Sequence, residues 1–197
     1  MHHIDCEMTE ELKNKIISCA HRRFLVSGIK WPNLDLVAND CMISRKMLDQ
    51  CFNRNKLIDV VIGNMMITYN QSLSAIEEAN LEPIAEMKRI LGLMEVLAND
   101  LSAIFLRDLR RYYLDHWLAL DKLVNVSFKQ LFIRNLMIGI EKRVYRKMIN
   151  VVLLTEIYFV TGLTLVENGL VDLQPELRND SMREMNVNFL AGILDHS

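Results

Sequence analysis

Apolar residues recur at helical spacing in three short runs near the start of the chain. The first run lines one face of a helix with Leu12, Ile16, Cys19, Ala20 and Phe24. The second repeats at i, i+3, i+4 and i+7, with Leu34, Val37, Ala38 and Cys41. The third buries Leu48 and Phe52 on one side and leaves its polar residues on the other. This pattern predicts three amphipathic helices within the first 55 residues.

Turn and capping residues separate these runs. Gly28 ends the first run, and Pro32 prevents the residue before it from being helical. Asn33 and Ser44 stand at N-cap positions of the second and third runs. A long helix is expected to follow from about Lys56. Two short helices joined by a tight turn form a helix-turn-helix, whose second helix enters the major groove of DNA.

The rest of the chain also reads as helix. Proline occurs only at positions 32, 83 and 175, and alternating β-branched strands with tight hairpin turns are missing. We therefore predict an all-α fold, with a helix-turn-helix head over residues 1–56 and a helical effector-binding and dimerisation body over 57–197. About nine helices are expected, and those of the body span 56–79, 83–98, 101–113, 115–142, 150–167 and 181–194. The clearest linkers are 80–83 and 168–180.

The head resembles the DNA-binding domain of the tetracycline-repressor (TetR) family of bacterial regulators. The matching residues fall at the family's spacings without a gap: Arg23-Phe24, Gly28, Ile29, Val37-Ala38, Ile43-Ser44, Leu48 and Phe52. The chain departs from the pattern where Pro32 replaces a threonine, Met42 the turn glycine and Asp49 a phosphate-contacting tyrosine. Asn55-Lys56 replaces a Lys-Glu pair.

Three later blocks extend the resemblance to TetR-type regulators from Bacteroidetes. They are FLRDLRRYYLDHW at 105–117, GIEKRVYRKMIN at 139–150 and NFLAGILDHS at 188–197. Within them Leu114 replaces a proline, Arg143 a glycine and Ala191 an arginine. The resemblance implies a ligand-responsive repressor that acts as a homodimer on a pseudo-palindromic DNA site. In such relatives a small ligand in the body shifts the fourth helix and releases DNA.

Residue chemistry assigns roles within the head. On the second short helix, Arg45 or Lys46 is expected to read guanine, and Gln50 to pair with adenine. Asp49 repels phosphate unless it accepts from a cytosine amino group. The remaining candidate DNA-binding residues are expected to contact phosphate and position the head: Ser44, Asn53, Arg54 and Lys56. Lys46 is an alternative phosphate contact.

The body offers a candidate effector pocket and a candidate dimer interface. Methionine is flexible and polarizable, and the chain holds 12 of them. The candidate pocket residues are Met65, Met66, Tyr69, Met87, Leu91, Met94, Phe105, Tyr112 and Trp117; ordinary core packing is the alternative. The segment 150–167 is apolar nearly all round, which predicts a homodimer through it and 181–194, with burial inside a monomer as the alternative.

Charge and composition agree with this interpretation. Up to Lys56 there are nine Lys and Arg against seven Asp and Glu, whereas the remainder holds fourteen against eighteen. A slightly basic head on an acidic body has the sign expected for DNA binding. No membrane span or signal peptide is evident, and the four cysteines lie at predicted core positions or near the N-terminus, so a reducing cytoplasm is expected.

No catalytic or cofactor motif is recognisable, so an enzyme is not expected. His2, His3 and Cys6 form at most an opportunistic metal group in an N-terminal tail, and no metal site is predicted. Two alternatives to a DNA-binding regulator stay open. One is a TetR-like dimer whose degenerate head no longer reads DNA and which acts through ligand or protein binding. The other is an unrelated helical interaction module.

Overall fold

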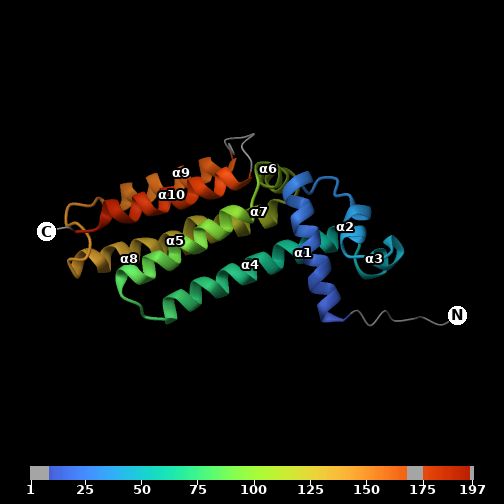
Figure 1. Ribbon diagram of the computed structural model, residues 1–197, viewed down its shortest axis with the longest axis horizontal. Helices are drawn as coiled ribbons and strands as arrows, with labels where there is room; N and C mark the ends of the chain where they lie inside the picture. Colours follow the sequence, from blue (N-terminus) through green and yellow to red (C-terminus); the bar gives the residue numbers. More distant parts are fainter. Residues whose placement is uncertain (1–8, 168–174, 196–197) are drawn as a thin grey trace. The chain divides into compact units, whose positions relative to one another are not determined.

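The computed structural model describes residues 9–167 and 175–195, and these are helical almost throughout (Figure 1). The described residues form no strand, and one isolated bridge pairs Tyr145 with Leu194. The elements are α1 (Glu10–Ser27), α2 (Leu34–Asp40), α3 (Arg45–Cys51), α4 (Arg54–Glu78), α5 (Pro83–Asn99), α6 (Ala103–Tyr112), α7 (Leu114–Lys122), η1 (Leu123–Phe128), α8 (Lys129–Glu141), α9 (Val151–Glu167) and α10 (Pro175–Ile193). The predicted all-α class is confirmed.

Most predicted helices have the observed boundaries to within two residues, with two differences. The helix expected over 115–142 is continuous, but its middle is the π-helical segment η1, which divides it into α7 and α8. The final helix begins at Pro175 instead of 181, so it takes up part of the predicted linker 168–180. Proline suits a first helical turn because its missing N–H has no partner there in any case. Residues 168–174 lie outside the described part.

The chain divides into two compact units that differ from a simple cut in the sequence. The first unit combines Met1–Met65 with Ile104–Trp117, and the second combines Met66–Ala103 with Leu118–Ser197. Helix α4 therefore contributes residues to both units. The first is called the head unit below and the second the body unit. The functional division predicted at residue 56 stays a prediction.

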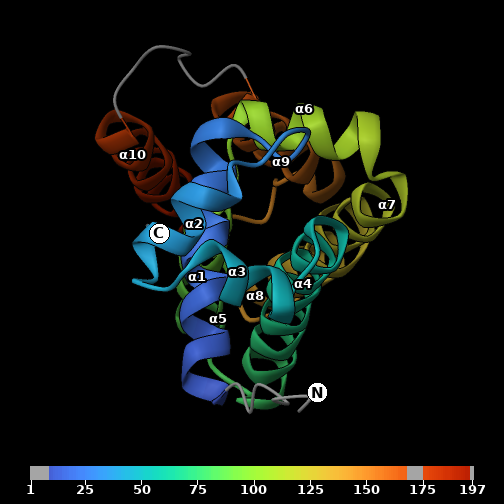
Figure 2. The same ribbon diagram turned by 90° about the vertical axis from the view of Figure 1, so that its right-hand side faces the viewer.

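In the head unit, α1, α2 and α3 pack in sequence around one apolar core (Figure 2). Each of the three predicted runs places its main apolar residues inside: Ile16, Cys19, Ala20, Phe24, Leu34, Val37, Ala38, Cys41, Leu48 and Phe52 are all buried. Both predicted caps are present, because Asn33 Oδ1 accepts from the N–H groups of Asp35 and Leu36, and Ser44 Oγ accepts from that of Met47.

The cysteines of the head are free thiols inside or beside this core. Cys19 and Cys41 are buried as expected, whereas Cys51 is half-buried. Burial raises the pKa of the Cys41 thiol to about 12. A protonated, enclosed thiol acts as a small apolar side chain, which is how the sequence predicted it. Cys6 lies outside the described residues.

In the body unit, α5, α8, α9 and α10 lie side by side as a helical bundle (Figure 1). Rings from three of these helices meet at Phe132, which stacks on Tyr158 at 4.9 Å between centroids and contacts Phe159 and Phe189. Within the described residues, no helix combines the length and hydrophobicity that crossing a bilayer requires.

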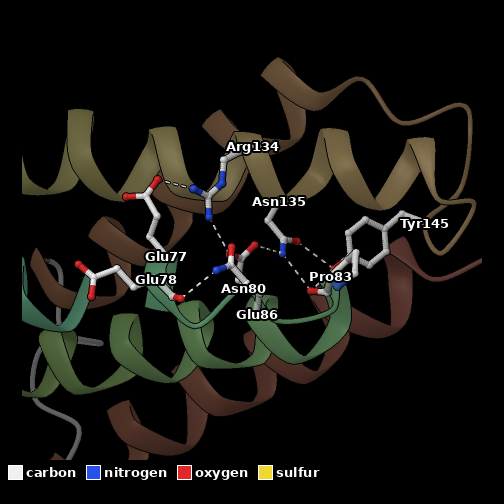
Figure 3. A network of polar contacts seen from close by, with 8 residues as sticks. All are labelled: Glu77, Glu78, Asn80, Pro83, Glu86, Arg134, Asn135 and Tyr145. Atoms are coloured by element: carbon white, nitrogen blue, oxygen red, sulfur yellow. Dashed lines mark hydrogen bonds and ion pairs between the residues drawn. The ribbon is translucent and has the colours of Figure 1, made fainter. Parts of the chain in front are cut away.

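A buried polar network joins α5 to α8 (Figure 3). Glu86 of α5 accepts from Arg134 at 2.7 Å and from Asn135 at 2.7 Å, and Arg134 also pairs with Glu77 of α4. The Tyr145 hydroxyl oxygen lies 2.8 Å from the Pro83 carbonyl oxygen and 2.9 Å from Asn135 Oδ1, so it can donate a hydrogen bond to either acceptor. Burial raises the pKa of Tyr145, so this hydroxyl stays a donor.

Candidate DNA interface

Helix α3 presents one buried face and one exposed polar face. Its N-cap is Ser44, and Leu48 anchors it in the core of the head unit. Every residue that the sequence predicted to contact DNA is exposed: Ser44, Arg45, Lys46, Asp49, Gln50, Asn53, Arg54 and Lys56. The predicted set therefore lies at the surface of α3 and of the start of α4, and its roles in DNA binding stay predictions.

These side chains differ in what already holds them. Lys46 and Gln50 make no side-chain hydrogen bond or ion pair within the described part of the chain, so they extend from α3 without an internal partner. Asn53 Oδ1 accepts from the Lys56 N–H at 2.8 Å, so it caps α4. Arg54 lies over the Trp31 ring, 5.3 Å from its centroid. The capping role of Asn53 was not foreseen.

Arg45 is held by two carboxylates. Its Nε donates to Asp49 Oδ1 at 2.9 Å, one turn later on α3, and its Nη1 donates to Asp35 Oδ1 at 3.1 Å, in the first turn of α2. The hydrogen bond that Arg45 donates to Asp49 is the largest of the effects that raise the pKa of the Arg45 guanidinium. Spacing on one helix predicts the Asp49 contact, but the Asp35 contact depends on how α2 and α3 pack.

A second acidic residue of α2 fixes the helix at its other end. Asp40 accepts two hydrogen bonds from Arg23 of α1, at 2.7 Å and 2.6 Å, in a bidentate pair. The Arg23 guanidinium lowers the pKa of the Asp40 carboxyl, chiefly through these hydrogen bonds. Helix α2 is therefore tied to α1 by Asp40 and to α3 by Asp35.

The turn after α1 depends on a residue that the sequence did not single out. Asp108 of α6 is buried, and its Oδ2 accepts from the N–H groups of Ile29 and Lys30, both at 3.0 Å. Gly28 has a φ of 74°, and a Cβ at that position would clash with the Asp108 carboxylate. The available signal was the aspartate within the 105–117 block, on which the family resemblance partly rested.

The turn between α2 and α3 carries its own irregularity. Met42 has a φ of 59°, in the left-handed region, and its side chain is exposed. This is the position where the TetR pattern has a glycine, so the departure seen in the sequence concerns backbone conformation. The turn keeps the glycine-like geometry with a residue that adopts it at a cost.

The candidate pocket residues divide between the two units. Phe105 is buried, Trp117 half-buried and Tyr112 exposed in the head unit, to which Met65 also belongs. In the body unit, Met87, Leu91 and Met94 are core residues of α5, Met66 is half-buried, and the buried Tyr69 donates to Asp100 at 2.6 Å. The set thus stays a prediction.

Three surface cavities of the body unit have other linings. One of about 300 Å³ lies between α4 and the start of α8 and is largely polar: Asn70, Leu73, Ser74, Glu77, Ser127, Gln130, Leu131 and Arg134. One of about 710 Å³ follows the outer face of α8, and one of about 300 Å³ lies at the start of α9. None of the nine candidate pocket residues lines any of these three.

The outer face of α9 is mainly apolar and exposed to solvent, and it also carries Glu156, which pairs with Lys129 of α8. Five large apolar side chains on it are between 43% and 68% exposed: Val152, Leu153, Ile157, Val160 and Leu163. Its inner face packs into the bundle through Tyr158 and Phe159. Apolar side chains therefore lie on both the inner and the outer face of α9, and those on the outer face are exposed to solvent in the single chain. Among the side chains of α10 that the structure describes (180–193), the large apolar one that is exposed is Val187.

The described residues contain no group of three or more His, Cys, Asp or Glu side chains arranged to hold a metal ion. His2, His3 and Cys6, the opportunistic group noted in the sequence, lie outside the described residues.

Comparison with known proteins gives a fold. No family model and no curated protein sequence matches the chain. Solved structures do match over nearly the full length of both chains. The transcriptional regulator FadR from Bacillus subtilis, in complex with stearoyl-CoA, is similar with a TM-score of 0.60 at 14% identity, covering 92% of this chain and 99% of that one.

Two further structures extend this result. A transcriptional regulator from Cytophaga hutchinsonii has a TM-score of 0.61 at 18% identity, with 93% and 98% of the two chains covered. A TetR-family transcriptional regulator from Streptomyces coelicolor has a TM-score of 0.58 at 12% identity, with 94% and 97% covered. At these identities the likeness concerns the fold, and the expected fold is confirmed.

Proposed function

We propose that this chain, which has the fold of TetR-family transcriptional regulators, is itself a DNA-binding transcriptional regulator that acts as a homodimer. The observation that carries the proposal is the exposed face of α3. A seven-residue helix is capped at its start, anchored by Leu48, and displays Arg45, Lys46 and Gln50 outward. These are the side chains that pair with base edges in a major groove.

Homodimerisation supplies the second half of a DNA site. The exposed apolar side chains on the outer face of α9 are in contact with water in a single chain. Burying them against a second copy favours association. A two-fold dimer presents two heads to successive major grooves, so its DNA site is a pseudo-palindrome. Analytical ultracentrifugation tests this step. The double variant Leu153→Asp/Ile157→Asp should be monomeric, whereas Ile67→Asp, at an equally exposed apolar residue of α4, should stay dimeric.

An apolar effector in the body is the proposed regulator of DNA binding. It would act as a population shift, because it binds the DNA-incompetent state more tightly than the competent one. Helix α4, which contributes residues to both units, is the element proposed to carry the change. Because a structurally similar regulator holds stearoyl-CoA, we would test that compound first. Release of DNA at micromolar stearoyl-CoA is the expected result, and unchanged binding would reject this effector class.

The main experiment measures binding of the purified protein to a labelled duplex from its own upstream intergenic region, against a scrambled duplex, at two salt concentrations. Selective binding that weakens steeply with salt is expected, since released counterions drive the association. The variant Arg45→Ala/Lys46→Ala should lose it. Lys88→Ala/Arg89→Ala removes two exposed positive charges from α5 of the body unit and should retain it.

One observation favours a different function. Arg45 is engaged by two carboxylates, and acidic groups beside it oppose phosphate, as a head that has lost DNA reading would show. In that case the body is the functional part, acting through ligand or protein binding. A folded dimer that binds neither duplex at low salt would establish this second function and reject the first.

A further inference from the structure

The contacts of Arg45 leave it partly occupied and partly available. A guanidinium has five N–H donors, and Asp49 and Asp35 engage one on Nε and one on Nη1. Three donors therefore remain, including both on Nη2. A guanine presents two neighbouring acceptors, N7 and O6, and a bidentate contact uses two donors. Arg45 can bind a guanine without giving up either carboxylate.

The two carboxylates come from different helices and bind different nitrogen atoms of the planar Arg45 guanidinium group. Asp49 lies one turn beyond Arg45 on α3, and Asp35 lies in the first turn of α2. A guanidinium held at Nε and at Nη1 cannot rotate about its terminal bonds without breaking a hydrogen bond. Preordering matters because a free arginine side chain loses rotamer entropy when DNA binding fixes it.

All three side chains are accessible to DNA. Arg45 is 41% exposed, Asp49 50% and Asp35 68%. Ion pairs this exposed add little to folding stability, so stability is a poor reason for two acids to converge on one arginine. Their charge has a clear cost for a DNA-binding surface, because each carboxylate repels phosphate.

We propose that Asp35 and Asp49 are positioning residues for Arg45, which they hold in the orientation that reads one guanine in each half of the DNA site. The inference rests on the proposed DNA-binding function. The carboxylates raise sequence selectivity by orienting the guanidinium, and they lower affinity for all DNA by adding negative charge. A head built this way discriminates well and binds unspecific DNA weakly.

The experiment uses the full-length dimer and measures preference separately from affinity. Binding sites are selected from random duplexes with the wild type. Dissociation constants are then measured for the selected site, for the same site with the guanine replaced by adenine, and for a scrambled duplex, at one salt concentration. The variants are Arg45→Lys, Asp35→Asn, Asp49→Asn and the control Asp115→Asn, which removes an exposed carboxylate of the head unit outside this contact.

The expected pattern separates orientation from charge. The wild type should prefer guanine by roughly tenfold or more, as a bidentate arginine contact provides. Arg45→Lys keeps the charge but loses the planar fork, so the preference disappears while scrambled DNA is still bound. Asp35→Asn and Asp49→Asn should each lower the preference by about threefold or more while scrambled DNA binds more tightly. Asp115→Asn should leave the preference unchanged.

Each contrary result has a defined meaning. If Asp35→Asn and Asp49→Asn keep the wild-type preference and Arg45→Lys loses it, Arg45 reads unaided and the positioning role is wrong, while the proposed function stands. If Arg45→Lys keeps the preference, Arg45 does not read the guanine and the inference is wrong. If the wild type selects no sequence, both the inference and the DNA-binding function fail. Circular dichroism of each variant confirms that it is folded.

Discussion

Arg45 of the head unit and Arg134 of the body unit are each held by two carboxylates, yet the two sites differ in nearly every consequence. Arg45 stands at the surface between Asp35 and Asp49. Arg134 lies between an exposed Glu77 and a Glu86 that is only 5% exposed. The first arrangement leaves donors for a partner outside the chain. In the second, Nη2 donates to the buried Glu86 and Nη1 to the exposed Glu77.

Burial decides what each arrangement contributes. An exposed ion pair gains little because water screens both charges and the side chains lose entropy on pairing. A buried carboxylate is costly to leave unpaired, since it has lost its hydration. Glu86 is therefore a structural group whose partners, Arg134 and Asn135, cannot be removed cheaply. Asp35 and Asp49 are exposed and should contribute little to folding, which is why we infer a functional role for their contacts with Arg45.

The largest effect should come from Glu86→Ala. It leaves Arg134 with one exposed partner. It also leaves one buried N–H of Asn135 without an acceptor, while the other still donates to the Pro83 carbonyl, so the free energy of unfolding should fall by about 3 kcal/mol. Urea denaturation followed by circular dichroism measures it. Glu77→Ala removes the exposed partner of the same arginine and should lower stability by less than about 1 kcal/mol. Equal losses in the two variants would show that burial is not the deciding factor.

The next largest effect on stability is expected at Gly139, which lies against the ring of Tyr145. The ring packs against Gly139 so closely that an added Cβ would clash with it, and the Tyr145 hydroxyl completes the polar network between α5 and α8. Gly139→Ala should therefore destabilise the body by roughly 1–3 kcal/mol through overpacking. In Gly92→Ala on α5 the new methyl meets nothing within 4 Å, so helix propensity should raise stability by about 0.5–1 kcal/mol. A gain at position 139 would contradict the close packing.

A smaller effect of opposite sign is expected in both regions at the left-handed residues. Met42 has a φ of 59° and Arg143 a φ of 60°, and both side chains are exposed. Glycine adopts this conformation freely, so Met42→Gly and Arg143→Gly should each stabilise the protein by about 0.5–1 kcal/mol in thermal denaturation. The exposed helical residue Lys88 supplies the control, because Lys88→Gly should destabilise by a similar amount.

Much of the fold follows from local patterns, and these residues show why. Asn33 and Ser44 were recognisable as caps because a cap depends on a few neighbouring residues. The glycine positions of the family pattern, here Met42 and Arg143, marked turns whose backbone conformation persists although the residue changed. The π-helical segment Leu123–Phe128 was not foreseen, because its apolar spacing differs too little from that of an α-helix.

The site was less predictable wherever contacts join distant segments. Exposure of the α3 residues follows from the periodicity around Leu48. The contact between Asp108 and the turn at Ile29 spans 79 positions, and that between Asp35 and Arg45 depends on the angle of two helices. Glu86 has the same limitation, because a single acid within an apolar run does not reveal that Arg134 and Asn135 will meet it. A single sequence does not show which residues of distant segments come into contact.

The smallest expected effect on stability is also the sharpest test of the comparison. Arg45→Ala deletes two ion pairs, but both are exposed and alanine suits a helix start, so the free energy of unfolding should change by less than about 1 kcal/mol. Urea denaturation at fixed protein concentration measures it. A loss of stability near that of Glu86→Ala would mean that the ion pairs of Arg45 with Asp35 and Asp49 are needed to hold α2 against α3. A negligible loss of stability, together with a loss of DNA selectivity, would show that Arg45 serves recognition, whereas Arg134 serves folding.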